Sequence, residues 1–270
     1  MDLSGWSGVR RQASTPSVMS PIVSVVIPSW NASASLRQTL EAFRALPEAC
    51  RESIELLVLD GGSTDGTLKV TADFMDVLAH VDSQPDMGVY DAMNRGVSKC
   101  RGQWIWFMGA GDIPHADGLQ TLLERSKAKS TAVGLACTVE ALPPIEPGVP
   151  KRFVPRWGKE LTWRNTIHHQ GLLAPRSWFV ETPFDVSLKV LADYAWLLQQ
   201  RNTGSAIECM PDITLAYAES QGLSRQFNWP LYLEEWKVKS RALHGWRRWL
   251  QLLWLPAKWL FKQMSKTLAI

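Results

Sequence analysis

Aspartates in glycine-rich turns carry most of the chemistry that this sequence could perform. Asp60 opens one such turn directly after the apolar run 54–59, and Asp112 closes another after the apolar run 104–108. Glycine-rich turns expose backbone N–H groups, and carboxylates beside them can hold a nucleotide or a metal–phosphate group. The chain is therefore expected to bind a phosphorylated small molecule at the carboxyl ends of neighbouring strands.

A segment dense in Asp, Gly and Asn, residues 86–96, lies between these two turns. Residues 90–100 have helical spacing, which places Tyr90 and Asn94 four positions apart on one face. Their polar groups are expected to line the same ligand crevice.

The elements that must position these residues follow from the apolar pattern. Residues 22–28, 54–59, 77–81 and 104–108 read as strands, and helices are expected from Ser33, from Thr67 and over 90–100. This alternation predicts βαβ units and an α/β fold with a mostly parallel sheet flanked by helices.

Two further expectations concern local detail. Leu68, Ala72, Met75 and Leu78 lie close to helical spacing in the helix that is expected from Thr67. The second half of the chain is less regular, with a proline-rich loop expected over 141–158 and a helix over 188–200. The sequence shows no internal repeat.

Bulk properties bound the class of protein. The 270 residues, 46% of them hydrophobic, suit one α/β domain with an extension and exclude a globally disordered chain. The four cysteines are widely spaced without metal-binding motifs, which favours reduced thiols in the cytosol. Residues 1–20 lack the apolar core of a signal peptide and are expected to form a disordered tail. No run of about 18 uncharged apolar residues predicts a transmembrane helix.

Seven short motifs in a fixed order give the sequence a family resemblance. From about residue 22 to residue 224 the chain resembles the family 2 glycosyltransferases of the GT-A fold, and it is similar to bacterial enzymes of exopolysaccharide and lipopolysaccharide O-chain assembly. The motifs are Val25-Val26-Ile27-Pro28 with Asn31, the turn from Asp60 to Thr67, the segment 86–96, Gly109-Ala110-Gly111-Asp112, His169-Gln170, Asp193-Tyr194 and Gly222-Leu223-Ser224.

The resemblance implies a fold, an activity and a domain organisation. A GT-A domain is expected over 21–228, with a nucleotide-binding half (21–115) and an acceptor half (116–228). The implied reaction is inverting transfer of a sugar from a nucleotide-sugar donor, expected to be a UDP-sugar, to a polyprenyl-linked or surface-polysaccharide acceptor. The residues implied to bind the donor are Pro28, Asn31, Asp60, Asp86, Tyr90, Asn94, Gly111, Asp112 and Arg225.

Two aspartates of the first turn have different expected roles. The resemblance assigns Asp60 to the N3–H of a uracil-like base, and the alternative is a turn in which its carboxylate binds its own backbone. Asp65 lies where an N-cap belongs and is expected to cap the following helix.

Asp112 is the candidate metal ligand. Two negative charges develop on a departing nucleoside diphosphate, and Mg²⁺ or Mn²⁺ held by a carboxylate would offset them. Many family members carry two acids here, but this chain has Gly111 in the first position, so a single carboxylate is available. A turn-capping role for Asp112 is the alternative.

Asp193 is the candidate catalytic base. Inverting transfer needs a carboxylate that takes the proton of the attacking hydroxyl, and the family places one at the start of a helix. The acid that often precedes it is Ala192 here, and a purely helix-stabilising aspartate is the alternative. His169 and Gln170 are expected on a strand on the acceptor side, or as a buried structural pair.

The last segment, 229–270, is basic and rich in tryptophan. Its apolar and basic residues separate onto different helical faces, which predicts helices on the inner-membrane surface, on the cytoplasmic side. Packing on the catalytic domain or on a second subunit is the alternative. No recognition motif points to nucleic acid.

Two other functions compete with a transferase. A sugar-nucleotide pyrophosphorylase normally carries a glycine-rich loop after the first strand, where this chain has Pro28-Ser29-Trp30-Asn31. A degenerate transferase acting as a binding or scaffold subunit fits the single acid at Asp112, whereas the retained Asp193 opposes it.

Overall fold

The computed structural model describes residues 20–128, 132–145, 149–219 and 229–242, together with Trp259. The structure does not describe Arg225, residues 1–19 of the expected tail 1–20, or the basic segment after residue 242 apart from Trp259.

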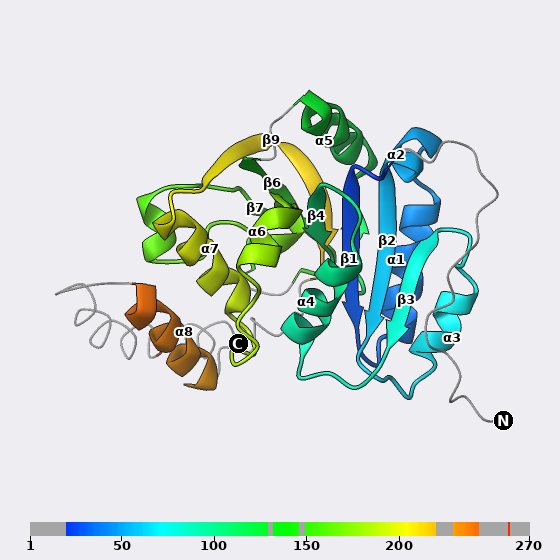
Figure 1. Cartoon of the computed structure of the whole chain (residues 1–270), viewed down its shortest axis with the longest axis horizontal. Helices are drawn as coiled ribbons and strands as arrows, with labels where there is room; N and C mark the ends of the chain where they lie inside the picture. The colour runs from blue at the N-terminus through cyan, green and yellow to red at the C-terminus, as the bar shows by residue number, and fades with distance from the viewer. Residues whose placement is uncertain (1–19, 129–131, 146–148, 220–228, 243–258, 260–270) are drawn as a thin grey trace.

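The described strands form one nine-stranded sheet in the order β3-β2-β1-β4-β8-β6-β9-β5, with β7 paired to β6 (Figure 1). The first half contributes β1 (Val23–Ser29), β2 (Ile54–Asp60), β3 (Leu78–Ser83) and β4 (Trp104–Phe107). The second half contributes β5 (Ile113–Pro114), β6 (Val133–Ala141), β7 (Arg152–Phe153), β8 (Leu172–Pro175) and β9 (Ala206–Ala218).

Helices cover both faces of the sheet. They are α1 (Ser33–Arg44), α2 (Glu48–Ser53), α3 (Thr67–Ala72), α4 (Val89–Lys99), α5 (Ala116–Ala128), α6 (Arg176–Glu181), α7 (Ala192–Asn202) and α8 (Trp229–Ala242), with short 3₁₀ turns at η1 (Lys159–Thr162) and η2 (His169–Gly171). None of the helices in the described ranges has the length and apolarity needed to cross a membrane.

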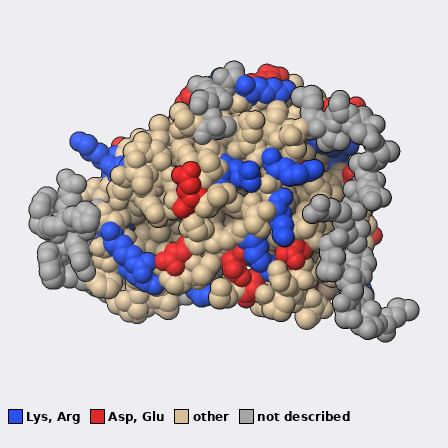
Figure 2. Space-filling model, in the orientation of Figure 1, with Lys and Arg blue, Asp and Glu red and all other residues tan. Residues whose placement is uncertain are grey.

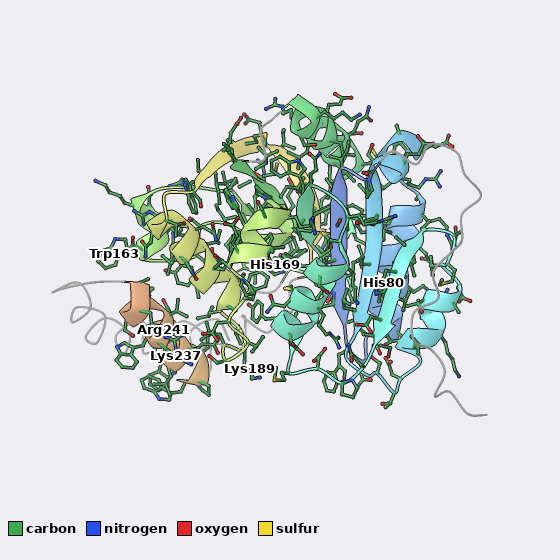
Figure 3. The ribbon with its side chains drawn as sticks, viewed as in Figure 1. His80, Trp163, His169, Lys189, Lys237 and Arg241 are labelled. Atoms are coloured by element: carbon green, nitrogen blue, oxygen red, sulfur yellow. The ribbon has the colours of Figure 1, made fainter. Side chains whose placement is uncertain are left out.

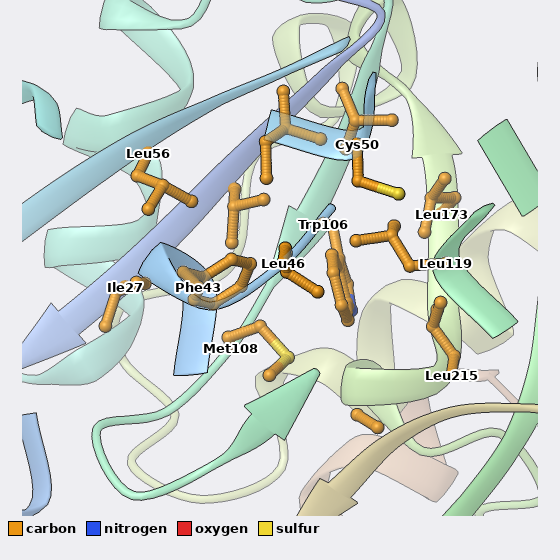
Figure 4. Close-up of a cluster of buried hydrophobic side chains, with 14 of the residues drawn as sticks. Ile27, Phe43, Leu46, Cys50, Leu56, Trp106, Met108, Leu119, Leu173 and Leu215 are labelled. Carbon is orange, nitrogen blue, oxygen red and sulfur yellow. The ribbon is translucent and has the colours of Figure 1, made fainter. Parts of the chain in front are cut away.

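The central strands divide the core into two layers. Along β1, Val25 and Ile27 pack with α1 and α5 on one face, whereas Val26 packs with α4 on the other. This alternation is the period-two pattern of a strand buried on both faces. On the first face the Phe43 ring meets Trp106 edge to face at 6.0 Å (Figure 4).

The predicted α/β fold is confirmed, and the first half of the chain forms a continuous parallel block, while β6 and β9 of the second half also pair in parallel. β3, β2, β1 and β4 are mutually parallel, and β8 then joins β4 in the antiparallel direction. The four strands and three helices expected in this half are present, with α2 added between α1 and β2.

Three local expectations were wrong. The helical spacing expected from Thr67 through Met75 and Leu78 ends at Ala72, because α3 is only six residues long and Leu78 begins β3. The helix expected from residue 188 begins at Ala192. His169 and Gln170 lie on the 3₁₀ turn η2 directly before β8, not on a strand.

Candidate active site

The turn after β2 is built around the Asp60 carboxylate. Oδ2 of Asp60 accepts the N–H groups of Gly62 and Ser63 at 3.1 and 3.0 Å and the Ser83 hydroxyl at 2.6 Å. Oδ1 accepts the Ser63 hydroxyl at 2.5 Å, and Asp60 is fully buried. Its contacts are those of the turn-forming alternative, and Oδ1 has one further lone-pair position without a hydrogen bond, enclosed by the turn in this structure.

The loop after β1 lies against this turn. Asn31 has a left-handed backbone (φ 47°), its N–H reaches Ser63 Oγ at 2.7 Å, and its Oδ1 accepts the N–H of Thr64 at 2.9 Å. Pro28 is buried within β1 beside Leu59 of β2, directly before the loop that carries Asn31. Asp65 accepts the N–H groups of Thr67 and Ser33, which begin two helices, and the hydrogen bond from Thr67 lowers the pKa of Asp65 to about 2.

Asp86 brings the next segment to the same place. Its Oδ2 lies 2.7 Å from the position that a Cβ on Gly61 would occupy, so only glycine fits there. Its Oδ1 accepts the N–H of Gly88 at 2.9 Å, and the Arg95 guanidinium lies 3.8 Å away. The Asp60 and Asp86 turns therefore meet at one edge of the sheet, as the sequence predicts.

The side chains of Tyr90 and Asn94 extend from α4 to the acceptor half. The Tyr90 hydroxyl donates to the Val190 carbonyl at 2.6 Å and lies 3.2 Å from Asp193 Oδ1. Burial raises the pKa of Tyr90 well above its ordinary value, so the hydroxyl remains a donor. The Asn94 amide bonds both the N–H and the carbonyl of Phe184 at 2.9 Å. These contacts join the two halves, and a donor contact for either residue stays a prediction.

Asp112 is buried in the turn after β4. Its Oδ2 accepts the N–H of Gly109 at 2.6 Å and the Gln170 amide at 2.8 Å, and its Oδ1 accepts the N–H of Glu219 at 3.1 Å. Burial raises the pKa of Asp112, and the hydrogen bonds from Gln170 and Gly109 offset only part of that effect.

Gly111 has a conformation that favours glycine, with φ at 105°. A Cβ at this position would lie 2.3 Å from the Glu219 carboxyl group. The carboxyl group of Glu219 therefore occupies the space beside Gly111 where a second acidic side chain would begin.

The turn η2 links the two candidate carboxylates. Gln170 holds Asp112 through its amide, and its backbone carbonyl accepts the Trp106 indole N–H at 2.8 Å. The neighbouring His169 places Nδ1 3.4 Å from Asp193 Oδ2 (Figure 3). His168 stacks on His169 and bonds Gln170 Oε1 through its own Nδ1.

Asp193 lies in the first turn of α7, where the helix dipole favours a negative charge. Its side chain is 16% exposed. Burial alone would raise the pKa of Asp193, but the hydrogen bond and charge of His169 outweigh it, so the pKa lies below its ordinary value. The Asp193 carboxylate is therefore ionised and partly accessible at neutral pH, as a general base requires.

The fold thus joins the predicted residues into one connected site. Asp112, Gln170, His169, Asp193 and Tyr90 form a continuous path of contacts across the carboxyl ends of the central strands. Arg225 and the motif Gly222-Leu223-Ser224 lie outside the described residues.

Three residues at this site were not predicted from the sequence. Trp30 is 67% exposed on the loop after β1, an unusual exposure for tryptophan that the motif Pro28-Ser29-Trp30-Asn31 could have suggested. Thr39 of α1 bonds the Gly111 N–H and the Asp112 carbonyl at 2.8 and 2.9 Å. Neither this contact nor that of Glu219 has a local sequence signal.

The donor set fits a divalent cation with few protein ligands. A carboxylate has about four lone-pair positions, and three hydrogen bonds leave one free on Oδ1 of Asp112. The exposed Glu219 carboxyl group lies beside the same turn. Among the described residues no cluster of three or more His, Cys, Asp or Glu exists, so Mg²⁺ or Mn²⁺ would need phosphate oxygens and water to complete its shell.

Comparisons with known proteins agree with this geometry. The family model described as "Glycosyl transferase family 2" matches residues 24–173, more than half of the 270 residues. A "PGL/p-HBAD biosynthesis glycosyltransferase" of Mycobacterium bovis is 30% identical over 215 residues, which cover 76% of this chain and 79% of that protein. The chondroitin synthase of Escherichia coli is 26% identical over 68% of this chain and 27% of its own length.

Solved structures share the fold. Staphylococcus aureus TarS 1-349 in complex with UDP-GlcNAc superposes with a TM-score of 0.65 at 17% identity, covering 80% of this chain and 65% of that chain. A mannosyltransferase from Pyrobaculum calidifontis in complex with GDP-Man and Mn²⁺ gives a TM-score of 0.57 at 16% identity, covering 83% and 63%. The chain has a GT-A-type fold and belongs to glycosyl transferase family 2.

Proposed function

We propose that this enzyme transfers a sugar from a UDP-sugar to an acceptor hydroxyl in a single displacement that inverts the anomeric carbon. The observation that carries the proposal is the placement of Asp193. Its carboxylate is ionised at the start of α7 and joined through His169 and Gln170 to the donor-side carboxylate of Asp112.

The two oxygens of Asp193 have different surroundings. Oδ1 lies 3.2 Å from the Tyr90 hydroxyl and accepts the Tyr194 N–H at 2.7 Å, which leaves Oδ2, on the His169 side, to receive a proton. The acceptor oxygen forms a bond to the anomeric carbon while its proton passes to Oδ2. The bond between the anomeric carbon and the diphosphate oxygen breaks, and its electron pair leaves with the diphosphate.

The donor side has the groups that a nucleotide needs. Asp60 keeps one acceptor position for the N3–H of uracil, Trp30 offers an exposed ring for stacking, and Asn31 and Asp86 line the same edge. Asp112 and Glu219 would hold Mg²⁺ or Mn²⁺, which when bound offsets the charge of the leaving diphosphate. The UDP-GlcNAc complex of TarS supports a UDP donor, and the GDP-Man complex makes a guanine donor the alternative to test.

We further propose a lipid-linked acceptor at the cytoplasmic face of a membrane, reached through the segment 229–270. Trp163, Trp229 and Leu233 are exposed on and beside α8. Lys237 and Arg241 extend from the same helix (Figure 3), and Figure 2 shows basic side chains with acidic ones beside them at this end of the molecule. Aromatic and aliphatic side chains beside cations suit an anionic lipid surface. In this account 21–228 is the catalytic domain and the tail 1–20 takes no part in the reaction.

The donor assignment is tested by thermal shift with UDP-, GDP- and dTDP-sugars, each with and without Mn²⁺, followed by NMR of the released or transferred sugar. Stabilisation by one nucleotide class and an inverted anomer are expected. The thermal shift should be lost in Asp112→Ala. It should be kept in the matched control Asp117→Asn, which changes an exposed aspartate of α5. Retention of anomeric configuration would contradict the displacement mechanism.

The membrane assignment is tested by co-sedimentation with phosphatidylglycerol and phosphatidylcholine vesicles. Replacement of Trp229 and Leu233 by Ser should weaken binding to the anionic vesicles, whereas Met75→Ser, on distant α3–β3, should not. Equal binding of all three proteins would remove support for this surface.

A binding subunit without turnover is the second candidate, because Gly111 replaces one acid and Asp112 is held by three hydrogen bonds. It predicts nucleotide binding with no donor hydrolysis in folded protein. Measurable hydrolysis that depends on Asp193 would exclude it.

A further inference from the structure

The segment that leads into α7 has no cap of its own. The N-cap residue is Leu191, and its side chain makes no capping hydrogen bond. An apolar residue at this position leaves the backbone N–H groups before and within the first turn without a local partner. Asp193 follows only two residues later, so its position depends on whatever holds this segment.

A carboxylate from α8 supplies the missing acceptors. Oε1 of Glu234 accepts the N–H groups of Val190 and Leu191 at 2.8 and 2.7 Å, and Oε2 accepts that of Lys189 at 3.1 Å. Three consecutive amides thus converge on one side chain from 43 to 45 positions along the chain. Hydrogen bonds to an ionised acceptor are among the stronger ones in proteins.

The same segment is held from the donor side. The Val190 carbonyl accepts the Tyr90 hydroxyl at 2.6 Å, and the Lys189 ammonium group donates to the Met87 carbonyl at 2.7 Å. Since the Tyr90 hydroxyl also lies 3.2 Å from Asp193 Oδ1, one short peptide stretch connects Glu234, Tyr90 and Asp193.

α8 itself is firmly placed against the domain. Lys239 is fully buried, with its ammonium group 2.7 Å from Glu235 Oε1 and 2.6 Å from the Trp163 carbonyl. Tyr232 and Val238 are buried as well, and α8 lies beside α7 (Figure 1). The exposed pair Arg241–Asp185 adds little by comparison. Glu234 is therefore presented from a fixed helix.

We infer that Glu234 is a positioning residue for Asp193, acting through the amides of Lys189, Val190 and Leu191. This inference rests on the proposed role of Asp193 as the base. It gives the first helix of the C-terminal segment a role in holding the base, because without Glu234 the amides of Lys189, Val190 and Leu191 lose the carboxylate that accepts them.

The test compares kcat and KM for donor hydrolysis, with UDP-GlcNAc and Mn²⁺ or the sugar nucleotide that gives the fastest wild-type rate. Glu234→Ala should lower kcat about 10- to 100-fold, because small displacements of a catalytic group have effects of that size, while KM for the donor stays within about 3-fold. Glu234→Gln keeps an oxygen for Val190 and Leu191 and should restore kcat to within about 3-fold of wild type. Leu233→Ala, one residue away and exposed, is the matched control.

A double-mutant cycle with Tyr90→Phe adds a readout that a general loss of stability would not give. Both side chains act on the same peptide, so their effects on kcat should be clearly less than additive. Thermal unfolding and hydrogen exchange of the 189–191 amides show whether each variant is folded and whether those amides have lost protection.

The outcomes separate this inference from the proposed function. Wild-type kcat in folded Glu234→Ala, a change confined to KM, or equal losses in the Gln and Ala variants would overturn the positioning role. Asp193→Asn is measured in the same series. Full activity of Asp193→Asn would instead overturn the assignment of the base, whatever Glu234 does.

Discussion

The donor turns and the base segment are held in place by different kinds of contact. In the turns each carboxylate binds amides two or three residues away, as Asp60 does with Gly62 and Ser63 and Asp86 does with Gly88. Asp112 combines a local bond to the N–H of Gly109 with a bond to Gln170, 58 residues away, whereas Asp193 contacts Tyr90, 103 residues away.

This difference separates binding from reaction. A turn that its own residues close can form as soon as the neighbouring strands pair, and it offers a nucleotide site of fixed shape. The geometry of the base depends on four segments that are distant in sequence, α4, η2, α7 and α8. A change in any of these segments can therefore displace Asp193. Changes in the turns should therefore affect nucleotide affinity, and changes along the remote contacts should affect turnover.

Gln170→Glu should have the largest effect, because it places a second carboxylate about where the Gln170 amide now lies, 2.8 Å from Asp112 Oδ2. Two buried carboxylates at this distance cannot both ionise, and loss of a hydrogen bond to a charged group costs about 1.5–3 kcal/mol. Because the two carboxyl groups share one proton, one of them has a raised pKa in the folded state. The loss of folding stability should therefore be large at pH 7 and smaller near pH 4. Denaturant unfolding at both pH values checks this, with exposed Gln199→Glu as control. An equal loss at both pH values would contradict the account.

Gly111→Asp, which restores the second acid of the motif, should lower stability rather than improve activity. The residue has φ at 105°, and a Cβ would lie 2.3 Å from Glu219 Oε1. A non-glycine residue in such a conformation costs about 1–3 kcal/mol.

The control for this prediction is Gly66→Ala, whose φ is 98° with nothing within 4 Å of a Cβ. The difference between the free energies of unfolding that the two variants lose measures the clash with Glu219. Replacing Glu219 by Ala in the Gly111→Asp variant should relieve that clash. A Gly111→Asp enzyme with wild-type stability and higher turnover would show that the space beside Gly111 is open.

His169→Ala should have the smallest effect, on pH dependence. Burial raises the pKa of Asp193, but the hydrogen bond and charge of His169 contribute most to lowering it below its ordinary value, so the pKa should rise when His169 is removed. The acid limb of log(kcat/KM) should therefore move to higher pH. The stability that ionised Asp193 contributes above pH 3.8, lost in the wild type as pH falls through the lowered pKa, should also shrink. An unchanged acid limb, as expected for the control His115→Ala, would exclude the coupling.

The first half of the fold could be predicted from sequence because its signals are local. β-branched runs buried on both faces, such as that of β1, and glycine turns after them specify strand, turn and helix without reference to the rest of the chain. The direction of β8 and the position of His169 and Gln170 on a 3₁₀ turn depend on pairing with β4 and β6, which no local pattern encodes.

The site divides in the same way. The spacing of Asp60, Asp86 and Asp112 predicted a common edge, and the structure places Asp60 and Asp86 together there. The roles of Thr39, Glu219 and Glu234 could not be found, because each acts through contacts with residues at least 43 positions away. Such contacts become visible only once the chain is folded.

The most direct test of this division measures UDP affinity by calorimetry and donor turnover in Asp193→Asn and Asp60→Ala. The account predicts that Asp193→Asn binds UDP like the wild type and loses about 10²- to 10⁴-fold in kcat. Asp60→Ala should bind UDP more weakly, by about 1–3 kcal/mol, and keep kcat at saturating donor within a few-fold. Wild-type turnover in Asp193→Asn, or loss of both properties in both variants, would contradict the separation of a locally built binding site from a remotely assembled base.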